Sequence, residues 1–264
     1  MIPRDYITEW RAQVPWIPDF QVEQDLVISR ALVEIFSNPV LSKALAFRGG
    51  TALNKLYLRP PARYSEDIDL VQVEAGPAGP LMDELRKILD PWLGNPQRKQ
   101  TENGVTLNYR FTSEGVPPIP LRLKVEINSR EHFTVFGVKR VEFSLQSRWS
   151  AGVGEVQTYE LDELLGTKLR ALFQRRKGRD LFDLATIPEH LKVDPDRVIQ
   201  AFLRYMEFGG HKVAREAFKL NLAAKMQHPG FISDLTPLLA EGVSWIPTEA
   251  YQSVSSRFIS RLPE

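Results

Sequence analysis

The sequence predicts an α+β protein with two domains, a mixed sheet with flanking helices over residues 1–154 and a helical domain over residues 155–264. Segments in which apolar and polar residues alternate, as in half-buried strands, occur in the first part of the chain. After Tyr159 the apolar residues recur instead at helical spacing. The glycine-rich run Ala151–Gly154 lies between the two patterns and is a natural domain boundary.

The composition is that of a globular protein without disulfides. The 264 residues are 43% hydrophobic and 25% charged, which suffices to bury a full core in two modest domains. No run is long and apolar enough to span a bilayer, and residues 1–6 lack the apolar core of a signal peptide, so we expect a cytoplasmic protein. Cysteine is absent and the four histidines are scattered, so a bound metal must be held mainly by oxygen.

Two elements precede the first motif. Residues 1–20 are rich in aromatic residues and proline, and we expect them to wrap the surface. Residues 22–36 place their apolar side chains near one face of a helix, which Asn38 and Pro39 end.

A glycine turn follows a short buried strand at residues 44–47. Thr51 is the expected N-cap of a helix that runs to Leu58, and Gly49 and Gly50 stand at its start. A glycine pair lets the backbone approach a ligand closely, and the free N–H groups of a helix start attract anions. This turn can hold a phosphate, although a Gly-Gly pair more often forms only a turn.

The next strand carries two carboxylates that point to the same side. Successive side chains alternate along a strand, so Asp67 and Asp69 share one face. Carboxylates held this close repel each other unless a cation lies between them, and a hard divalent ion with oxygen ligands removes the conflict. The alternative is a solvated edge strand without a metal.

The remainder of the first domain contains further strands around one helix. A helix is predicted over residues 81–93, strands over residues 105–111 and 121–128, and a hairpin or strand pair over residues 134–145. Glu126 lies on the polar face of its strand between basic residues. It is either a further carboxylate of a metal site or a partner in a cross-strand ion pair.

Helices make up the second part of the chain. From residue 159 to 172 the leucines follow helical spacing, and Lys168 falls on their apolar stripe. An inward lysine is costly unless its ammonium meets an anion, which is either a nucleotide phosphate or a structural carboxylate. Further helices are predicted over residues 195–208, 213–226, 235–239 and 248–262.

Asp180 and Asp183 lie three residues apart and so on one face of the helix that follows Gly178. Basic residues without an intervening acid occur in two blocks, residues 43–65 and 166–179. If the blocks converge, they make a positive rim for phosphates or an RNA end. The alternatives are an Arg–Asp ion pair that locks the two domains and, for each block, a solvated helix face.

The glycine turn, the paired carboxylates and the later basic and acidic residues form one ordered pattern along the chain. The residues concerned are Gly49-Gly50-Thr51-Ala52-Leu53, Tyr57 and Arg63-Tyr64-Ser65-Glu66-Asp67-Ile68-Asp69-Leu70, followed by Glu160, Lys168, Arg170, Arg179, Asp180 and Asp183. This pattern resembles the AbiEii/MenT-type toxins of abortive infection and type IV toxin–antitoxin systems, a branch of the polymerase-β-like nucleotidyltransferases. The resemblance covers about residues 20–190, with a longer connection at Arg59–Ala62.

The resemblance implies roles for the site residues. Asp67 and Asp69 would bind Mg²⁺ or Mn²⁺, with Glu126 as a third ligand or as the base on the acceptor. The residues that would hold phosphate oxygens of a nucleoside triphosphate are Gly49, Gly50, Thr51, Ser65, Lys168 and Arg179. A downstream aspartate completes the family's site, with Asp180 as the first choice and Asp183 as the second, and Arg63 is a further candidate.

The resemblance also implies a toxin that transfers a nucleoside monophosphate to RNA. The expected acceptor is the 3′ end of tRNA, whose modification inhibits translation and growth, and the expected partner is an antitoxin encoded nearby. Phosphorylation of Ser65, beside Asp67, would repel a triphosphate. The alternatives are transfer to a protein or small molecule, a catalytically silent nucleotide or RNA binder, and a structural scaffold.

Overall fold

The computed structural model describes residues 2–264, so that Met1, the first residue of the predicted sheet domain, lies outside the described residues. The chain forms two compact units. The first consists of the residues up to Thr134 together with Val138–Tyr159, and the second of Val135–Gly137 with Glu160–Glu264. The chain therefore enters the second unit twice, briefly at Val135–Gly137 and finally after Tyr159.

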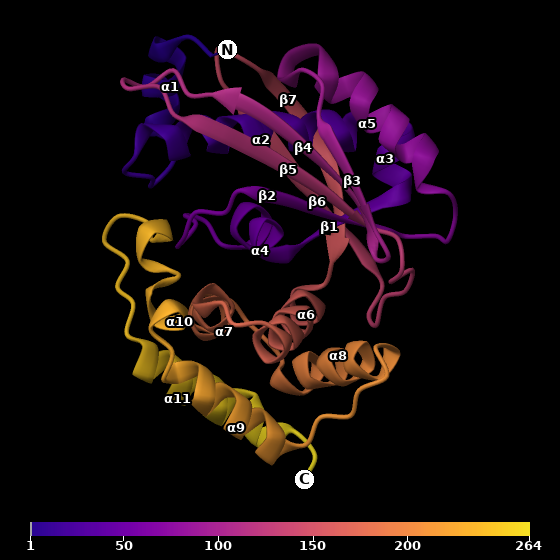
Figure 1. Cartoon of the computed structure of the whole chain (residues 1–264), viewed down its shortest axis with the longest axis vertical. Coiled ribbons are helices and arrows are strands. Elements are labelled where there is room, and N and C mark those ends of the chain that lie inside the picture. The colour runs from indigo at the N-terminus through magenta and orange to yellow at the C-terminus, as the bar shows by residue number, and fades with distance from the viewer. Residues whose placement is uncertain (1) are drawn as a thin grey trace. The chain divides into compact units, whose positions relative to one another are not determined.

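The first unit is built on a mixed sheet of seven strands in the order β3-β4-β5-β2-β1-β7-β6 (Figure 1). Their bounds are β1 Leu45–Arg48, β2 Asp67–Gln72, β3 Gln97–Thr101, β4 Gly104–Thr112, β5 Pro120–Asn128, β6 Val138–Gln146 and β7 Ala151–Tyr159. The pairs β2–β5 and β1–β7 are parallel and the others antiparallel. This confirms the predicted α+β class and its mixed sheet.

Helices cover one face of this sheet. The helices of the first unit are α1 Arg4–Arg11, α2 Asp19–Ser37, α3 Pro39–Ala44, α4 Gly49–Ala52 with a π-helical continuation Leu53–Tyr57, and α5 Ala78–Leu93. Helices α2, α3 and α5 contact the strands and one another (Figure 1). The buried apolar face beneath them includes Ile68, Leu107 and Val125, which are in register across β2, β5 and β4.

The second unit is helical. Its elements are α6 Leu161–Gln174, α7 Gly178–His190, α8 Pro195–Phe208, α9 Arg215–Met226, α10 Pro229–Ser233, the 3-10 turns Thr236–Leu238 and Ile259–Arg261, and α11 Pro247–Arg257. The buried Glu163 carboxylate accepts the backbone N–H groups of Val135 and Phe136 and the hydroxyl of Tyr205. These bonds explain why the short excursion Val135–Gly137 belongs to this unit.

Three local predictions are corrected. Ala151–Gly154 lies within β7 rather than at a boundary, and its glycines leave room for α2, because a Cβ on Gly152 would meet Val33 within van der Waals distance. Residues 1–20 contain α1, whose Trp10 is buried and donates its indole N–H to Asp25. Helix α4 begins at Gly49, so Thr51 lies inside it and is not the N-cap.

The predicted helices at residues 22–36, 81–93 and 195–208 and the predicted strands at residues 105–111 and 121–128 are confirmed. Strand β3 is an addition, because its exposed residues, Gln97–Thr101, are all polar and give no alternation to detect. Within residues 2–264 we find no helix with the length and hydropathy of a membrane span.

Candidate active site

Strand β2 carries Asp67 and Asp69 on one face, between β1 and β5. Residues in register across a sheet share a face, and Asp69 is in register with Arg48 of β1 and Glu126 of β5. Asp67 is in register with Lys124. The strand pairing therefore brings Asp67, Asp69 and Glu126 to the same face, where basic residues flank them.

The two aspartates are in electrostatic conflict. Burial, and after it the neighbouring Asp69 carboxylate, raises the pKa of Asp67 from its ordinary value of 3.8 to about 6, although Lys124 and Arg122 act in the opposite direction. Within residues 2–264, the buried Oδ1 of Asp67 also has no hydrogen-bond partner. A buried polar atom of this kind is rare because it lacks the solvation that it had in water. Both features indicate a place for a cation.

The oxygen ligands of this face fit a hard divalent ion only in part. Asp67 and Asp69 supply two carboxylates, which Mg²⁺ prefers to nitrogen or sulfur ligands. Glu126 instead forms an ion pair with Lys124, with 2.5 Å between Oε2 and Nζ. Among the described residues no three Asp, Glu, His or Cys side chains cluster as a metal site. Glu126 would have to exchange Lys124 for the ion to become its third ligand.

The glycine turn approaches the Asp69 carboxylate directly. Gly49 has a φ of +81°, and a Cβ at this position would collide with Oδ2 of Asp69. Gly49 is therefore required both by its backbone conformation and by the space that Asp69 occupies.

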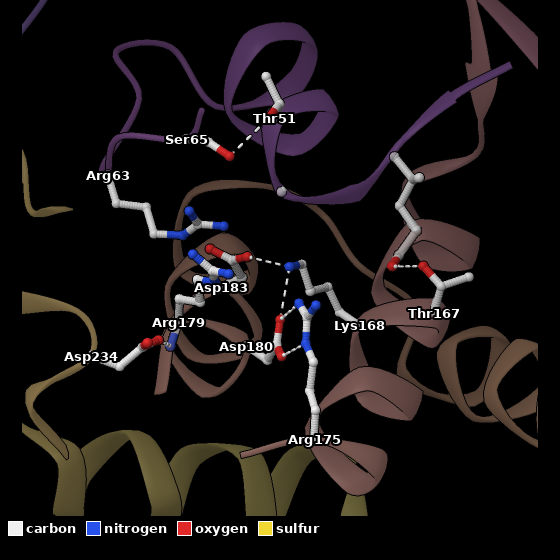
Figure 2. A network of polar contacts seen from close by, with 12 residues as sticks. Thr51, Arg63, Ser65, Thr167, Lys168, Arg175, Arg179, Asp180, Asp183 and Asp234 are labelled. Carbon is white, nitrogen blue, oxygen red and sulfur yellow. Dashed lines mark hydrogen bonds and ion pairs between the residues drawn. The ribbon is translucent and has the colours of Figure 1, made fainter. Parts of the chain in front are cut away.

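Two hydroxyls join the turn to β2. Thr51 Oγ1 donates to the carbonyl of Asp67 and lies 2.7 Å from Ser65 Oγ, so Ser65 is the donor in the second bond (Figure 2). The loop that leads into β2 is also anchored by Arg63, which is buried and donates from Nη1 to the carbonyl of Tyr64 at 3.0 Å. These bonds fix the backbone that carries the two aspartates.

Strand pairing places several basic residues next to the two aspartates. Arg48 forms an ion pair with Glu131, and Lys124 with Glu126. Arg122 and Lys124 both act on the pKa of Asp67. The motif did not mark these residues as part of the site, because only the register of β1, β2 and β5 places them there. Lys55, in the first basic block, pairs with Asp25 at 2.7 Å and is not available to a ligand.

The second unit contains a buried network around Lys168. The Nζ atom lies 2.9 Å from Asp180 and 3.1 Å from Asp183, and Asp180 also accepts hydrogen bonds from the guanidinium of Arg175 (Figure 2). Burial raises the pKa of Asp180, but Lys168 and Arg175 more than offset this and hold it well below its usual range. In this structure the inward lysine thus meets the carboxylates of Asp180 and Asp183.

Part of the second basic block is paired with acidic residues of the same unit. Lys177 pairs with Asp234, whose carboxylate also accepts the backbone N–H of Arg179. Arg170 lies over the ring of Tyr205. Within this block Lys168, Arg175 and Lys177 are therefore paired with acidic residues of the helical unit.

Comparisons with known proteins agree with this fold. A model of the AbiEii nucleotidyl transferase toxin family of type IV toxin–antitoxin systems matches residues 30–252. No curated protein matches the chain. MenT4, a nucleotidyltransferase toxin from Mycobacterium tuberculosis, superimposes with a TM-score of 0.63 at 16% identity, covering 99% of this chain and 91% of that one.

Two structures from Helicobacter pylori have the same fold. A protein described as a putative nucleotidyltransferase gives a TM-score of 0.57 at 17% identity over 89% of this chain and 92% of its own. JHP933 gives 0.55 at 16% identity over 90% of each chain. At these sequence identities the three comparisons show a shared fold and nothing more specific.

The fold and the family match together show that this protein is a nucleotidyltransferase. The chain belongs to the AbiEii nucleotidyltransferase toxin family. Membership in this type IV toxin–antitoxin family implies a nucleoside triphosphate substrate and an antitoxin partner.

Gly49→Ala tests the close approach of the glycine turn. We expect a loss of about 2 kcal/mol or more in the free energy of unfolding, because alanine is strained at this φ and its Cβ displaces Asp69. Urea denaturation measures the loss. The control is Gly79→Ala in α5, where a Cβ meets nothing within 4 Å. Equal denaturation midpoints for the two variants would contradict the required role of Gly49.

The raised pKa of Asp67 makes the metal-free protein less stable at higher pH. Between its unfolded value of 3.8 and its folded value of about 6, the folded state binds more protons, so stability falls as the pH rises through this window and then stays low. The full shift corresponds to about 3 kcal/mol. In chelator at pH 8 we expect Asp67→Asn to melt above the wild type, with the gap closing near pH 4. A gap that does not change with pH contradicts this account.

Lys168→Met leaves the two buried aspartates with too little positive charge. We expect a loss of about 3–5 kcal/mol in the free energy of unfolding, as for the removal of one partner of a buried ion pair. The double variant Lys168→Met/Asp180→Asn, measured by the same urea titration, should recover part of this loss because it restores the charge balance. Additive losses would show that the pairing with Asp180 does not stabilise the fold.

Proposed function

We propose that this protein transfers a nucleoside monophosphate from a nucleoside triphosphate to the 3′ end of tRNA, in a reaction that depends on Mg²⁺ or Mn²⁺. The observation that carries the proposal is the pair Asp67 and Asp69, with the unpartnered Oδ1 of Asp67, beside a glycine turn. Paired carboxylates next to a phosphate-binding turn suit nucleotidyl transfer.

Asp67 and Asp69 would hold the ion, and Glu126 would join them after release from Lys124 or act as the base. When bound, the ion supplies positive charge to the triphosphate oxygens. The backbone of Gly49, Gly50 and Thr51 would hold phosphate oxygens by its N–H groups. Ser65 would contribute its hydroxyl, which in the present structure donates to Thr51.

The reaction itself is a displacement at the α-phosphorus. The acceptor hydroxyl oxygen forms a bond to this phosphorus, the bond to the bridging oxygen breaks, and pyrophosphate leaves with the bonding electrons. The hydroxyl proton passes to a base, for which Glu126 is the candidate on the Asp69 face. The residues therefore orient the triphosphate, and the positive charge offsets the charge on pyrophosphate.

Lys168, Arg179 and Asp180 are proposed from the family pattern, with Asp183 and Arg63 as further candidates. The Lys168 ammonium already has two carboxylate partners. To bind a phosphate it would exchange one of these two partners. Asp180 and Asp183 would then hold Lys168 in position and keep its side chain protonated.

Modification of the tRNA 3′ end would prevent aminoacylation and so inhibit translation and growth in the cytoplasm. The antitoxin would be encoded nearby and need not bind the toxin. Phosphorylated Ser65 would place a second anion beside Asp67 and repel the triphosphate. Activity that survives in Ser65→Asp would contradict this form of control.

The first experiment is to incubate the purified protein with Mg²⁺, total tRNA and each of the four α-labelled nucleoside triphosphates in turn. We expect the wild type to label tRNA with one or more nucleotides. Asp67→Ala and Asp69→Ala should give background label, because each removes a proposed metal ligand. Melting temperatures with and without Mg²⁺ check that the variants are folded and that only the wild type is stabilised by the ion.

Two controls identify the acceptor. Periodate destroys the 3′-terminal diol of RNA, so treated tRNA should accept no label if the 3′ end is the site. Total protein replaces tRNA in a parallel reaction. Label in protein and not in RNA would overturn the choice of acceptor while retaining nucleotidyl transfer, and binding of triphosphate without transfer would indicate a silent binder.

A further inference from the structure

The face of the sheet that carries Asp67 and Asp69 continues across β5, β4 and β3. The register gives two rows of residues in line with the aspartates. These rows are Asp67-Lys124-Asn108-Gln97 and Asp69-Glu126-Thr106-Lys99. The apolar residues of the same strands point to the opposite face, beneath the helices. The polar rows are therefore a surface that extends outward from the proposed metal site.

Two arginines form the next row of this surface. Arg110 of β4 is directly in register with Arg122 of β5, and both side chains are exposed. Within residues 2–264 neither guanidinium has a hydrogen-bond or ion-pair partner. Like charges directly opposite each other destabilise a pair of strands. The fold therefore gains nothing from this arrangement.

No acid within the two strands offsets the arginines. Glu126 is the one acidic residue of β4 and β5, and it is paired with Lys124. An anion placed between Arg110 and Arg122 would remove their repulsion, and the planar guanidinium suits the oxygens of a phosphate. The pair thus has the properties of a phosphate site that the protein itself leaves unfilled.

The position of the pair relative to Asp67 indicates which phosphate it binds. Arg122 stands two residues from Lys124, which is in register with Asp67, so it lies about 7 Å further along the strand. At this distance the pair is within reach of a backbone phosphate among the last nucleotides of a strand whose 3′ end lies beside Asp67.

The strand order separates this pair from the glycine turn. Gly49 follows β1, on one side of β2, whereas β5 and β4 lie on the other side. A triphosphate held by the turn therefore occupies the β1 side of the aspartates. The β5 and β4 side is left for the acceptor strand.

We propose that Arg110 and Arg122 bind a backbone phosphate of the acceptor RNA, among the last nucleotides before its reacting 3′ end. The inference rests on the proposed function for the identity of the RNA, but the binding itself does not require catalysis. A contact to phosphate gives affinity and position without reading sequence. The pair would place the 3′ hydroxyl beside Asp67 and Asp69, so both arginines are positioning residues.

The test measures binding of a short single-stranded RNA with a free 3′ hydroxyl, in chelator and without nucleotide. The variant is Arg110→Gln/Arg122→Gln. Its control is Arg86→Gln/Arg98→Gln, which removes the same charge from α5 and from the opposite face of the sheet, since Arg98 is in register with the buried Leu107. Affinity is measured by fluorescence anisotropy over a range of salt concentrations.

We expect the variant to bind RNA on the order of tenfold more weakly at 0.1 M salt, with a salt slope smaller by about 0.7, because the contact to one phosphate is lost. The control should bind like the wild type, and the variant's affinity for nucleoside triphosphate should not change. It should melt at or above the wild-type temperature because the repulsion is gone.

Equal RNA affinity and salt slope in the variant and the control would overturn the proposal. A selective loss of triphosphate affinity would also overturn it, because the pair would then belong to the nucleotide. A lower melting temperature would reveal a structural role and count equally against it. If no RNA accepts label but RNA binding still depends on the pair, the proposed function fails and this inference stands.

Discussion

The first unit is arranged around one constraint, the repulsion between the carboxylates of Asp67 and Asp69. Strand alternation places the two carboxylates on one face, and burial keeps water from separating their charges. The surroundings accommodate the pair without neutralising it. Gly49 leaves room for Asp69, Thr51 fixes the backbone of Asp67, and Lys124 is occupied by Glu126. A proton on Asp67 or a cation from outside the chain would relieve the conflict.

The sheet supports this arrangement because its two faces have different tasks. Under α2 and α5 the strands present apolar side chains such as Leu107 and Val125, which supply the hydrophobic stabilisation of the unit. The other face of β2 and β5 is polar, and it carries like-charged pairs that cost stability. A protein can maintain such a face where the buried side more than compensates for it.

Local periodicity was sufficient to predict the elements whose pattern lies within a few neighbouring residues. The alternation at residues 121–128, the helix at residues 195–208 and the pairing of Asp67 with Asp69 each depend on the spacing of such neighbours, and the strands and helices appear as expected. The start of α4 was misplaced because a threonine after two glycines has the features of an N-cap. The helix begins instead at Gly49, which has a positive φ and packs against Asp69, a residue outside the local pattern.

Features that depend on strand pairing could not be predicted. The glycines of Ala151–Gly154 suggested a boundary, but they occur in a strand because α2 passes close to Gly152. Similarly, nothing near Arg110 or Arg122 in the sequence shows that the two are directly opposite each other, since this depends on the register of β4 and β5. The same holds for Lys124 and Arg48 beside the aspartates.

Charged groups that are paired within the chain can be distinguished from those that lack a partner among the described residues. Lys168 is buried, but Asp180 and Asp183 satisfy its ammonium within the helical unit, so its position needs no ligand to explain it. Asp67 Oδ1 has no such partner among the described residues. A crowded charge or an unpaired polar atom lowers the stability of the fold. A protein retains such a group where a bound ligand pairs with it. By this criterion the unpaired oxygen on the face of β2 is where we propose that a ligand binds, and for Lys168 to bind a phosphate it would first have to give up a carboxylate.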